Sequence, residues 1–211
     1  AAGEPDFDTP QHIKDAAKKA IDNGFTKYTP VSGIPSLKKA IIEKFKRDNN
    51  LEYGLNEVIV GVGGKQCVFN FCLAVLNSGD EVIIPAPYWV SYADIALVSD
   101  AKPIIVECGI EQKFKMTASQ LEKVITPKTK LVILNSPSNP TGAVYSKEEL
   151  TSLADVLIKH PNILIGTDDM YEHVKLKDMP FFNILNVNPA LKDRCVVMNG
   201  VSKAYSMTGW R

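Results

Sequence analysis

The sequence lacks an excess of charge of either sign. Its 24 lysine and arginine residues balance 24 aspartate and glutamate residues, so the formal net charge is zero. A surface that binds nucleic acid or anionic membranes needs a basic excess or a basic block, and neither is present. Long apolar runs are also missing, since no stretch approaches the roughly 20 residues of a membrane span. We therefore expect no nucleic-acid partner and no membrane association.

Paired cysteines and a signal peptide are lacking as well. The chain has four cysteines without a CxxC pair or a metal-ligand spacing: Cys67, Cys72, Cys108 and Cys195. Residues 1–6 have neither the basic nor the apolar region of a signal peptide. These features favour a reducing, cytoplasmic location and predict no metal site.

What is present is the composition of an ordinary globular protein, with 45% hydrophobic and 23% charged residues over 211 positions. Internal repeats, low-complexity stretches and convincing linkers are not found, so we expect one domain over residues 1–211. The chain starts within a loop-like segment and stops within a motif, which favours a portion of a longer protein.

Strand and helix patterns alternate along most of the chain. Thr9 is predicted to cap a first helix, with Pro10 as its first residue, and a second helix is expected to end at Asn49–Asn50. Capping boxes at Thr117/Gln120 and Ser146/Glu149 predict two later helices. Strands are predicted at residues 57–61, 81–85, 103–106, 131–135, 163–168 and 195–198. This alternation is typical of an α/β fold with a mainly parallel sheet flanked by helices.

Ligands of such sheets bind beyond the carboxyl ends of the strands. The first predicted strand is followed by a glycine-rich turn with Gly63, Gly64 and Lys65, which opens a helix. Unobstructed amides at a helix start favour an anion cradle over a plain tight turn. Because Gln66 replaces both the Ser or Thr of a P-loop and the third glycine of a dinucleotide fingerprint, neither motif is present.

Aromatic and amide groups follow the next strands. Trp89 lies on a proline-containing loop, where it can either stack on a flat heterocycle or pack in the core, whereas core packing is favoured for Tyr88. Asn139 belongs to an Asn-Pro-Thr-Gly turn. Turn chemistry accounts for this motif by itself, but the amide can also hydrogen-bond to a ligand.

Two carboxylates and a lysine complete the set. Asp168 and Asp169 end a buried strand, which requires a cation, a bound metal such as magnesium, or a capping role. Lys203 follows the last strand; it is either a solvated surface charge or a partly desolvated amine that can attack a carbonyl. Together with the phenol of Tyr171, these groups would suit a phosphorylated aromatic aldehyde that contains nitrogen.

These residues form motifs of a known family. The chain resembles the class I pyridoxal-phosphate-dependent aminotransferases, most closely the bacterial aspartate aminotransferases, from Gly3 to Arg211. Seven motifs in this order carry the resemblance: Ala2-Gly3-Glu4-Pro5-Asp6-Phe7, Lys27-Tyr28-Thr29-Pro30, Gly63-Gly64-Lys65-Gln66, Pro87-Tyr88-Trp89-Val90-Ser91-Tyr92, Asn139-Pro140-Thr141-Gly142, Asp168-Asp169-Met170-Tyr171, and Ser202-Lys203 through Gly209-Trp210-Arg211.

The resemblance implies a role for each matching residue. Lys203 would form a Schiff base with pyridoxal 5′-phosphate and move the Cα proton, and Asp168 would keep the pyridine nitrogen protonated. Tyr171 and Asn139 would hydrogen-bond to the phenolic oxygen, and Trp89 would stack on the ring. The implied phosphate ligands are Gly63, Gly64, Lys65, Ser202 and Arg211, with Tyr28 reaching the partner subunit's phosphate. The implied substrate contacts are Gly3, Trp89 and Asn139.

The resemblance further implies a fold type I large domain and a cytoplasmic homodimer. The amino acid substrate would be aspartate and the 2-oxo acid 2-oxoglutarate, and Lys65 would also help to admit a larger dicarboxylate such as prephenate. Two departures stand out: Asp169 replaces a frequent glutamate, and the rest of the large domain, the small domain and the substrate-binding arginines lie outside these residues. The 211 residues alone are therefore expected to be inactive. A β-lyase or decarboxylase of the same fold, or a non-catalytic nucleotide-binding module, are the alternatives.

Overall fold

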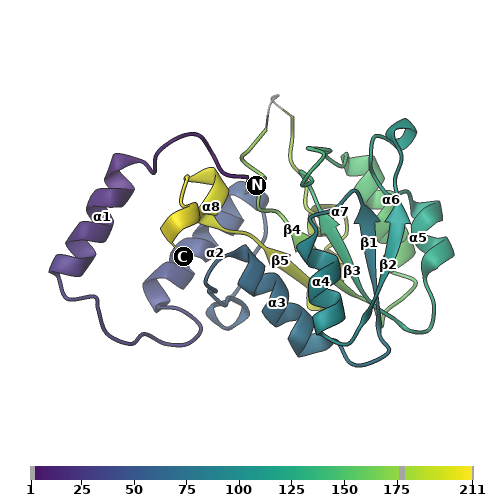
Figure 1. The fold of residues 1–211 in the computed structure, drawn as a ribbon, viewed down its shortest axis with the longest axis horizontal. Helices are drawn as coiled ribbons and strands as arrows, with labels where there is room; N and C mark the ends of the chain where they lie inside the picture. Colours follow the sequence, from purple (N-terminus) through teal and green to yellow (C-terminus); the bar gives the residue numbers. More distant parts are fainter. Residues whose placement is uncertain (1–2, 176–178, 211) are drawn as a thin grey trace. The chain divides into compact units, whose positions relative to one another are not determined.

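The computed structural model describes residues 3–175 and 179–210, which form two compact units (Figure 1). Residues 64–199 make up one of them, called here the sheet unit. The other, the terminal unit, combines the chain up to Gly63 with the segment from Gly200 onward. Each unit is described on its own below.

The sheet unit contains five parallel strands in the order β2-β1-β3-β4-β5. Their bounds are β1 Glu81–Ala86, β2 Lys102–Glu107, β3 Thr129–Asn135, β4 Leu164–Asp168 and β5 Cys195–Met198. The last residues of β3, β4 and β5 are aligned at one end of the sheet, because Asn135 pairs with Asp168 and Asp168 pairs with Met198. The predicted α/β fold with a parallel sheet is confirmed.

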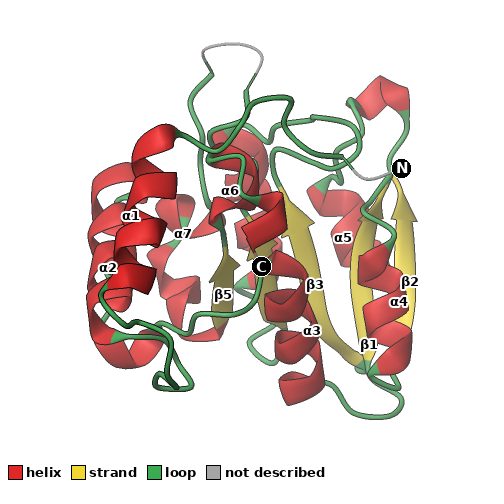
Figure 2. Cartoon of the chain, turned by 60° about the vertical axis from the view of Figure 1, so that its left-hand side comes forward, coloured by secondary structure: helices red, strands yellow, loops and turns green. Residues whose placement is uncertain are grey.

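Helices cover both faces of this sheet. Their bounds are α3 Gly64–Val75, α4 Ser91–Val98, α5 Ala118–Val124, α6 Lys147–Leu157 and α7 Ile184–Val187, with short 3-10 turns at Ile110–Gln112 and Pro189–Arg194. Figure 2 shows α3 and α4 in front of the sheet and α5 and α6 behind it. Two-sided burial explains why the strands are nearly all apolar, with Val82, Ile83 and Ile84 fully buried.

Local capping chemistry begins the helices at the predicted positions. The Thr117 hydroxyl accepts a hydrogen bond from the Gln120 amide at the start of α5, and the Ser146 hydroxyl accepts one from the Glu149 amide at the start of α6, both at 3.2 Å. In each case the third helical side chain bonds back to the capping residue, which satisfies two orphan donors at once. Both capping boxes are therefore confirmed.

The terminal unit is helical. It contains α1 Gln11–Asp22, α2 Pro35–Asn49, a 3-10 turn at Leu55–Glu57, α8 Val201–Ala204 and a 3-10 turn at Thr208–Trp210. The prediction that Thr9 caps α1 is wrong, because Pro10 occupies the N-cap position without a side-chain bond. The Thr9 hydroxyl instead donates to the carbonyl of Ser206. None of the helices within residues 3–175 and 179–210 combines the length and apolarity needed to cross a bilayer.

The first predicted strand, residues 57–61, is also wrong. Glu57 ends a 3-10 turn and the following residues have no strand pairing. The amide of Val60 donates to the carbonyl of Ser32, which lies in a loop. Val58 is buried whereas Ile59 is 77% exposed. A β-branched run forms a strand only where a neighbouring strand offers a matching edge, and here the hydrogen-bond partner is a loop.

Candidate active site

The centre of the candidate site is Asp168, the last residue of β4. Its side chain is buried, and each carboxylate oxygen accepts one hydrogen bond. The Tyr92 hydroxyl donates to Oδ2 at 2.6 Å, and the Met170 amide donates to Oδ1 at 3.1 Å. Burial raises the pKa of Asp168, and the two hydrogen bonds partly counteract that effect. The site thus holds a desolvated carboxylate in one fixed orientation.

Tyr92, a residue to which the sequence pattern assigned no role, is the side-chain partner of Asp168. It lies in α4, where burial first and the Asp168 carboxylate second raise its pKa well above the ordinary value. The phenol is therefore a hydrogen-bond donor at any physiological pH. Its ring packs edge-on against Trp89, with centroids 5.3 Å apart. Tyr92 follows Trp89 by three residues, a spacing that brings two side chains together on one face of a helical turn. This spacing is the sequence signal from which a role for Tyr92 could have been predicted.

Amide side chains connect the ends of β3 and β4. Asn135 donates to the Asp168 carbonyl at 2.8 Å and accepts from the Asn139 amide at 2.7 Å. Asn139 in turn donates its side-chain amide to the Tyr171 hydroxyl at 3.4 Å. Burial, followed by the nearby Asp168 carboxylate, raises the pKa of Tyr171. The sheet register therefore brings Asn139 and Tyr171 together beside Asp168. Asn135 is a further residue of the site, for which the sequence motifs predicted no role.

The neighbouring carboxylate, Asp169, has different partners. It accepts hydrogen bonds from the Thr167 hydroxyl at 2.7 Å and from the Asn183 amide at 2.6 Å. Burial raises its pKa from 3.8 to about 7. Separate donors thus satisfy the two adjacent acids. No group of three or more His, Cys, Asp or Glu side chains in the described part of the chain is arranged to hold a metal ion.

The glycine turn before α3 forms a close-packed helix start. Gly63 adopts a φ of +84°, which favours glycine, and α3 begins at Gly64. A Cβ added at Gly64 would lie 2.4 Å from Cε of Met170, so a side chain there would require the flexible end of Met170 to move. Exposed Lys65 lies with Nζ 5.0 Å from the centroid of the Trp89 ring. The amides at the start of this 12-residue helix carry partial positive charge and suit an anion.

Other predicted residues lie in the terminal unit. Lys203 is part of α8, is half-buried, and donates its ammonium to the carbonyl of Gly3. Ser202 beside it is buried, and Tyr28 is fully exposed. The structure thus brings Lys203 and Gly3 together within this unit. Arg211, the predicted phosphate ligand, lies outside the described residues.

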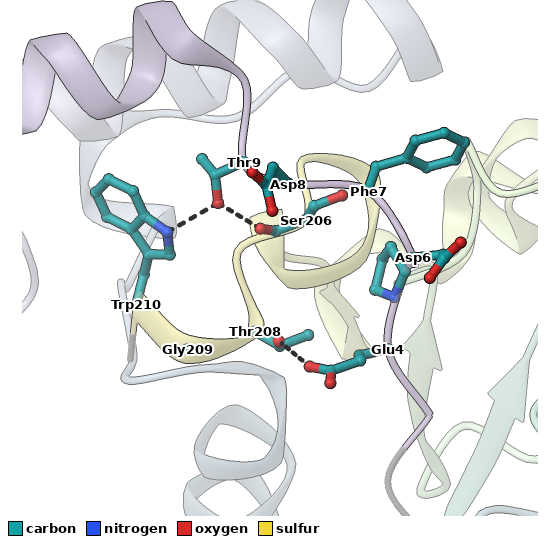
Figure 3. Close-up of a pocket in the computed structure, with 10 residues that line it drawn as sticks. Glu4, Asp6, Phe7, Asp8, Thr9, Ser206, Thr208, Gly209 and Trp210 are labelled. Atoms are coloured by element: carbon teal, nitrogen blue, oxygen red, sulfur yellow. Dashed lines mark hydrogen bonds between the residues drawn. The ribbon is translucent and has the colours of Figure 1, made fainter.

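The terminal unit also has an open cavity of about 690 Å³ (Figure 3). Hydrogen bonds from Trp210 to Thr9 and from Thr208 to Glu4, both 2.9 Å, join its walls. Three carboxylates, Glu4, Asp6 and Asp8, line it. These charges would repel a phosphate, so this cavity is a poor match for an anionic ligand.

In comparisons with known proteins, the matching family model and the relatives are all aminotransferases. The family model for "Aminotransferase class I and II" matches residues 1–211. An aspartate/prephenate aminotransferase of Nitrosomonas europaea is 64% identical over 210 residues, covering all of this chain and 53% of the relative, and one of Cereibacter sphaeroides is 58% identical, with 52% of the relative covered. This chain spans about half the length of the curated relatives it matches.

Solved structures agree. The aspartate aminotransferase from Rhizobium meliloti superimposes with a TM-score of 0.98 at 52% identity, covering the whole of this chain and 53% of that one. An aromatic aminotransferase from Pyrococcus horikoshii gives a TM-score of 0.96 at 40% identity, with 56% of that chain covered.

Proposed function

The chain belongs to the class I and II aminotransferase family, and from that membership we propose that the whole protein transfers an amino group between an amino acid and a 2-oxo acid with pyridoxal 5′-phosphate as cofactor. Residues 1–211 would form most of the cofactor-binding large domain. The remaining large domain, the small domain and the substrate-carboxylate arginines would lie elsewhere in the protein.

The buried Asp168 carboxylate is the observation that carries this proposal. Burial raises the pKa of Asp168, so its ionised form would be stabilised by a nearby cation. The protonated nitrogen of a pyridine ring is such a cation. Because Tyr92 and Met170 fix both carboxylate oxygens, the acid would meet the ring nitrogen without first reorienting. The start of α3, where the helix amides carry partial positive charge, is a matching anion site in the same unit. The residues present therefore fit this cofactor.

When bound, pyridoxal 5′-phosphate supplies an electron-accepting ring that delocalises the charge left when the substrate Cα loses a proton. Lys203 would anchor the aldehyde covalently in the resting enzyme, and its amine would take and return the proton at Cα. Tyr171 and Asn139 would hydrogen-bond to the phenolic oxygen, and Trp89 would stack on the ring. The phosphate would be held by Gly63, Gly64, Lys65, Ser202 and Arg211, with Tyr28 contributing to the partner subunit.

Aspartate and 2-oxoglutarate are the proposed substrates, with Gly3, Trp89 and Asn139 as contacts. The support is the name of the relatives, which are aspartate/prephenate aminotransferases. Lys65 lies over the Trp89 ring, and its ammonium could also help to admit a larger dicarboxylate such as prephenate. A β-lyase or decarboxylase that uses the same lysine and aspartate is the second candidate, and the substrate-binding arginines would separate the two.

A cytoplasmic homodimer is the proposed state of the enzyme. None of the four cysteines, all within the described residues, forms a disulfide bond, which agrees with a reducing compartment. The full exposure of Tyr28 agrees with a role at a partner subunit.

Borohydride labelling tests the proposal directly. The full-length protein is incubated with pyridoxal 5′-phosphate, reduced, digested and mapped by mass spectrometry. We expect a single reduced adduct on Lys203. Label on another lysine, or no label, would refute the assignment. The nucleotide-binding alternative predicts no visible absorbance from a bound cofactor.

A further inference from the structure

Asp169 lies between Asp168, which ends β4, and Tyr171, which lies in the turn that follows. The proposed function uses both of these residues. Its amide donates to the carbonyl of Met198 at the end of β5, at 2.8 Å, and its carbonyl accepts from the amide of Glu172, at 3.0 Å. The first bond ties the turn to the neighbouring strand, and the second closes the turn that contains Tyr171. A backbone rotation at Asp169 would therefore displace Asp168 on one side and Tyr171 on the other.

The side chain of Asp169 restricts that rotation. It is 1% exposed, and its two oxygens accept from Thr167 and Asn183 at 2.7 and 2.6 Å. The oxygen of Asn183 is already engaged, since it accepts from the Leu185 amide at 2.8 Å as the N-cap of α7. This bond defines which end of the Asn183 amide faces Asp169, so the NH₂ group is the donor.

We propose that Asp169, held by Thr167 and Asn183, is a positioning residue that orients Asp168 and Tyr171 toward the cofactor. The proposal rests on the proposed function for its catalytic meaning. It assigns Asp169 no contact with substrate or cofactor; its effect passes through the turn. A merely structural residue would change global stability without changing this turn selectively.

Asn183→Ser is the primary test, made in the full-length protein. Serine retains an N-cap acceptor for α7 and removes the donor to Asp169. Asn186→Ser is the matched control, because Asn186 lies in the same short helix and its side-chain oxygen accepts from the backbone amide of Asn183, whereas the bond to Asp169 comes from the Asn183 side chain. Asp169→Asn is the conservative variant, since it keeps an oxygen for Asn183 and a polar group for Thr167.

Two readouts are specific to the turn. In the cofactor-free protein, hydrogen exchange at the amides of Met170 and Glu172 should accelerate about tenfold or more in Asn183→Ser and change little in the control, because both amides are bonded within the turn. In the cofactor-loaded protein, the pH midpoint of the visible absorbance should move in Asn183→Ser, kcat should fall while KM stays near the native value, and Asp169→Asn should resemble the native protein.

Equal exchange rates in Asn183→Ser and Asn186→Ser would overturn the proposal, whatever the cofactor result. An unchanged absorbance midpoint with faster exchange would also overturn it, because the turn would then move without affecting the site. Failure of the borohydride label on Lys203 would refute the proposed function separately, since the exchange experiment needs no cofactor.

Discussion

Replacement of Tyr92 by phenylalanine should raise the pH at which the full-length protein loses its proposed aminotransferase activity on the acid side. The change deletes one hydroxyl and leaves the ring that packs against Trp89. It removes the 2.6 Å hydrogen bond to Oδ2 of Asp168 and leaves only the Met170 amide on the other oxygen. The ionised form of Asp168 then loses a donor, so the pKa of this carboxyl, already raised by burial, rises further.

The magnitude follows from the type of bond. A hydrogen bond to a charged group in a buried site contributes about 1.5–3 kcal/mol. If that energy acts on the proposed ring-nitrogen contact, kcat at neutral pH falls by about tenfold to a hundredfold, since about 1.4 kcal/mol corresponds to a factor of ten. We expect the lower end of this range, because the Met170 bond remains. The Trp89 contact and the core should be little affected, because Tyr92 keeps its ring.

The assay is the pH profile of kcat and kcat/KM for the full-length enzyme, with a thermal melt on each sample. Tyr145→Phe is the matched control: Tyr145 is equally buried, and its hydroxyl accepts from the Met116 amide at 2.8 Å, without a bond to Asp168. The control should lose about 1 kcal/mol of stability and keep the native pH profile. An acid limb in Tyr92→Phe identical to that of Tyr145→Phe would refute the reasoning.

Three further predictions concern the same fold. Burial raises the pKa of Asp169 from 3.8 to about 7, so the folded state binds more protons and the free energy of unfolding falls as pH rises from about 4 to 7, by at most about 4 kcal/mol from this group. The raised pKa of Asp168 contributes a slope of the same sign, so Asp169→Asn should reduce the slope in pH-dependent urea melts without abolishing it, and an unchanged slope would contradict the reasoning. Gly64→Ala should displace the flexible end of Met170 and weaken cofactor affinity by no more than about 1 kcal/mol, and Met170→Ala in the same protein should restore affinity in a fluorescence titration; no recovery would argue against the contact. Arg194 donates to the carbonyl of Leu157 at the end of α6 and to those of His160 and Ile163 before β4, at 2.6–3.2 Å. Arg194→Met should therefore lower the melting temperature by a few degrees, a loss of about 1–3 kcal/mol, with unchanged kcat, and a native melting temperature would refute that role.

Local patterns predicted the secondary structure where short-range physics decides it. The capping boxes at Thr117 and Ser146 start α5 and α6, because their hydrogen bonds join residues three apart. The apolar run at residues 131–134 lies in β3, a strand buried on both faces. Since parallel strands end together, the order of motifs also placed Asn139 and Tyr171 at the same end of the sheet. The family resemblance, carried by seven motifs, was likewise a property of the sequence alone.

Tertiary structure decided the contacts between distant residues. Tyr92 and Asp168 are 76 positions apart, and only the packing of α4 against the sheet brings the phenol to the carboxylate. Residues 57–61 have the β-branched composition of a strand but bond to a loop, since strand formation depends on a partner edge that composition does not encode. The sequence likewise does not distinguish Asp168 from Asp169, because both are carboxylates at the end of a predicted strand. Their separate donors, Tyr92 for one and Thr167 with Asn183 for the other, exist only in the folded chain, because hydrogen bonds between buried side chains require the surrounding elements to pack first.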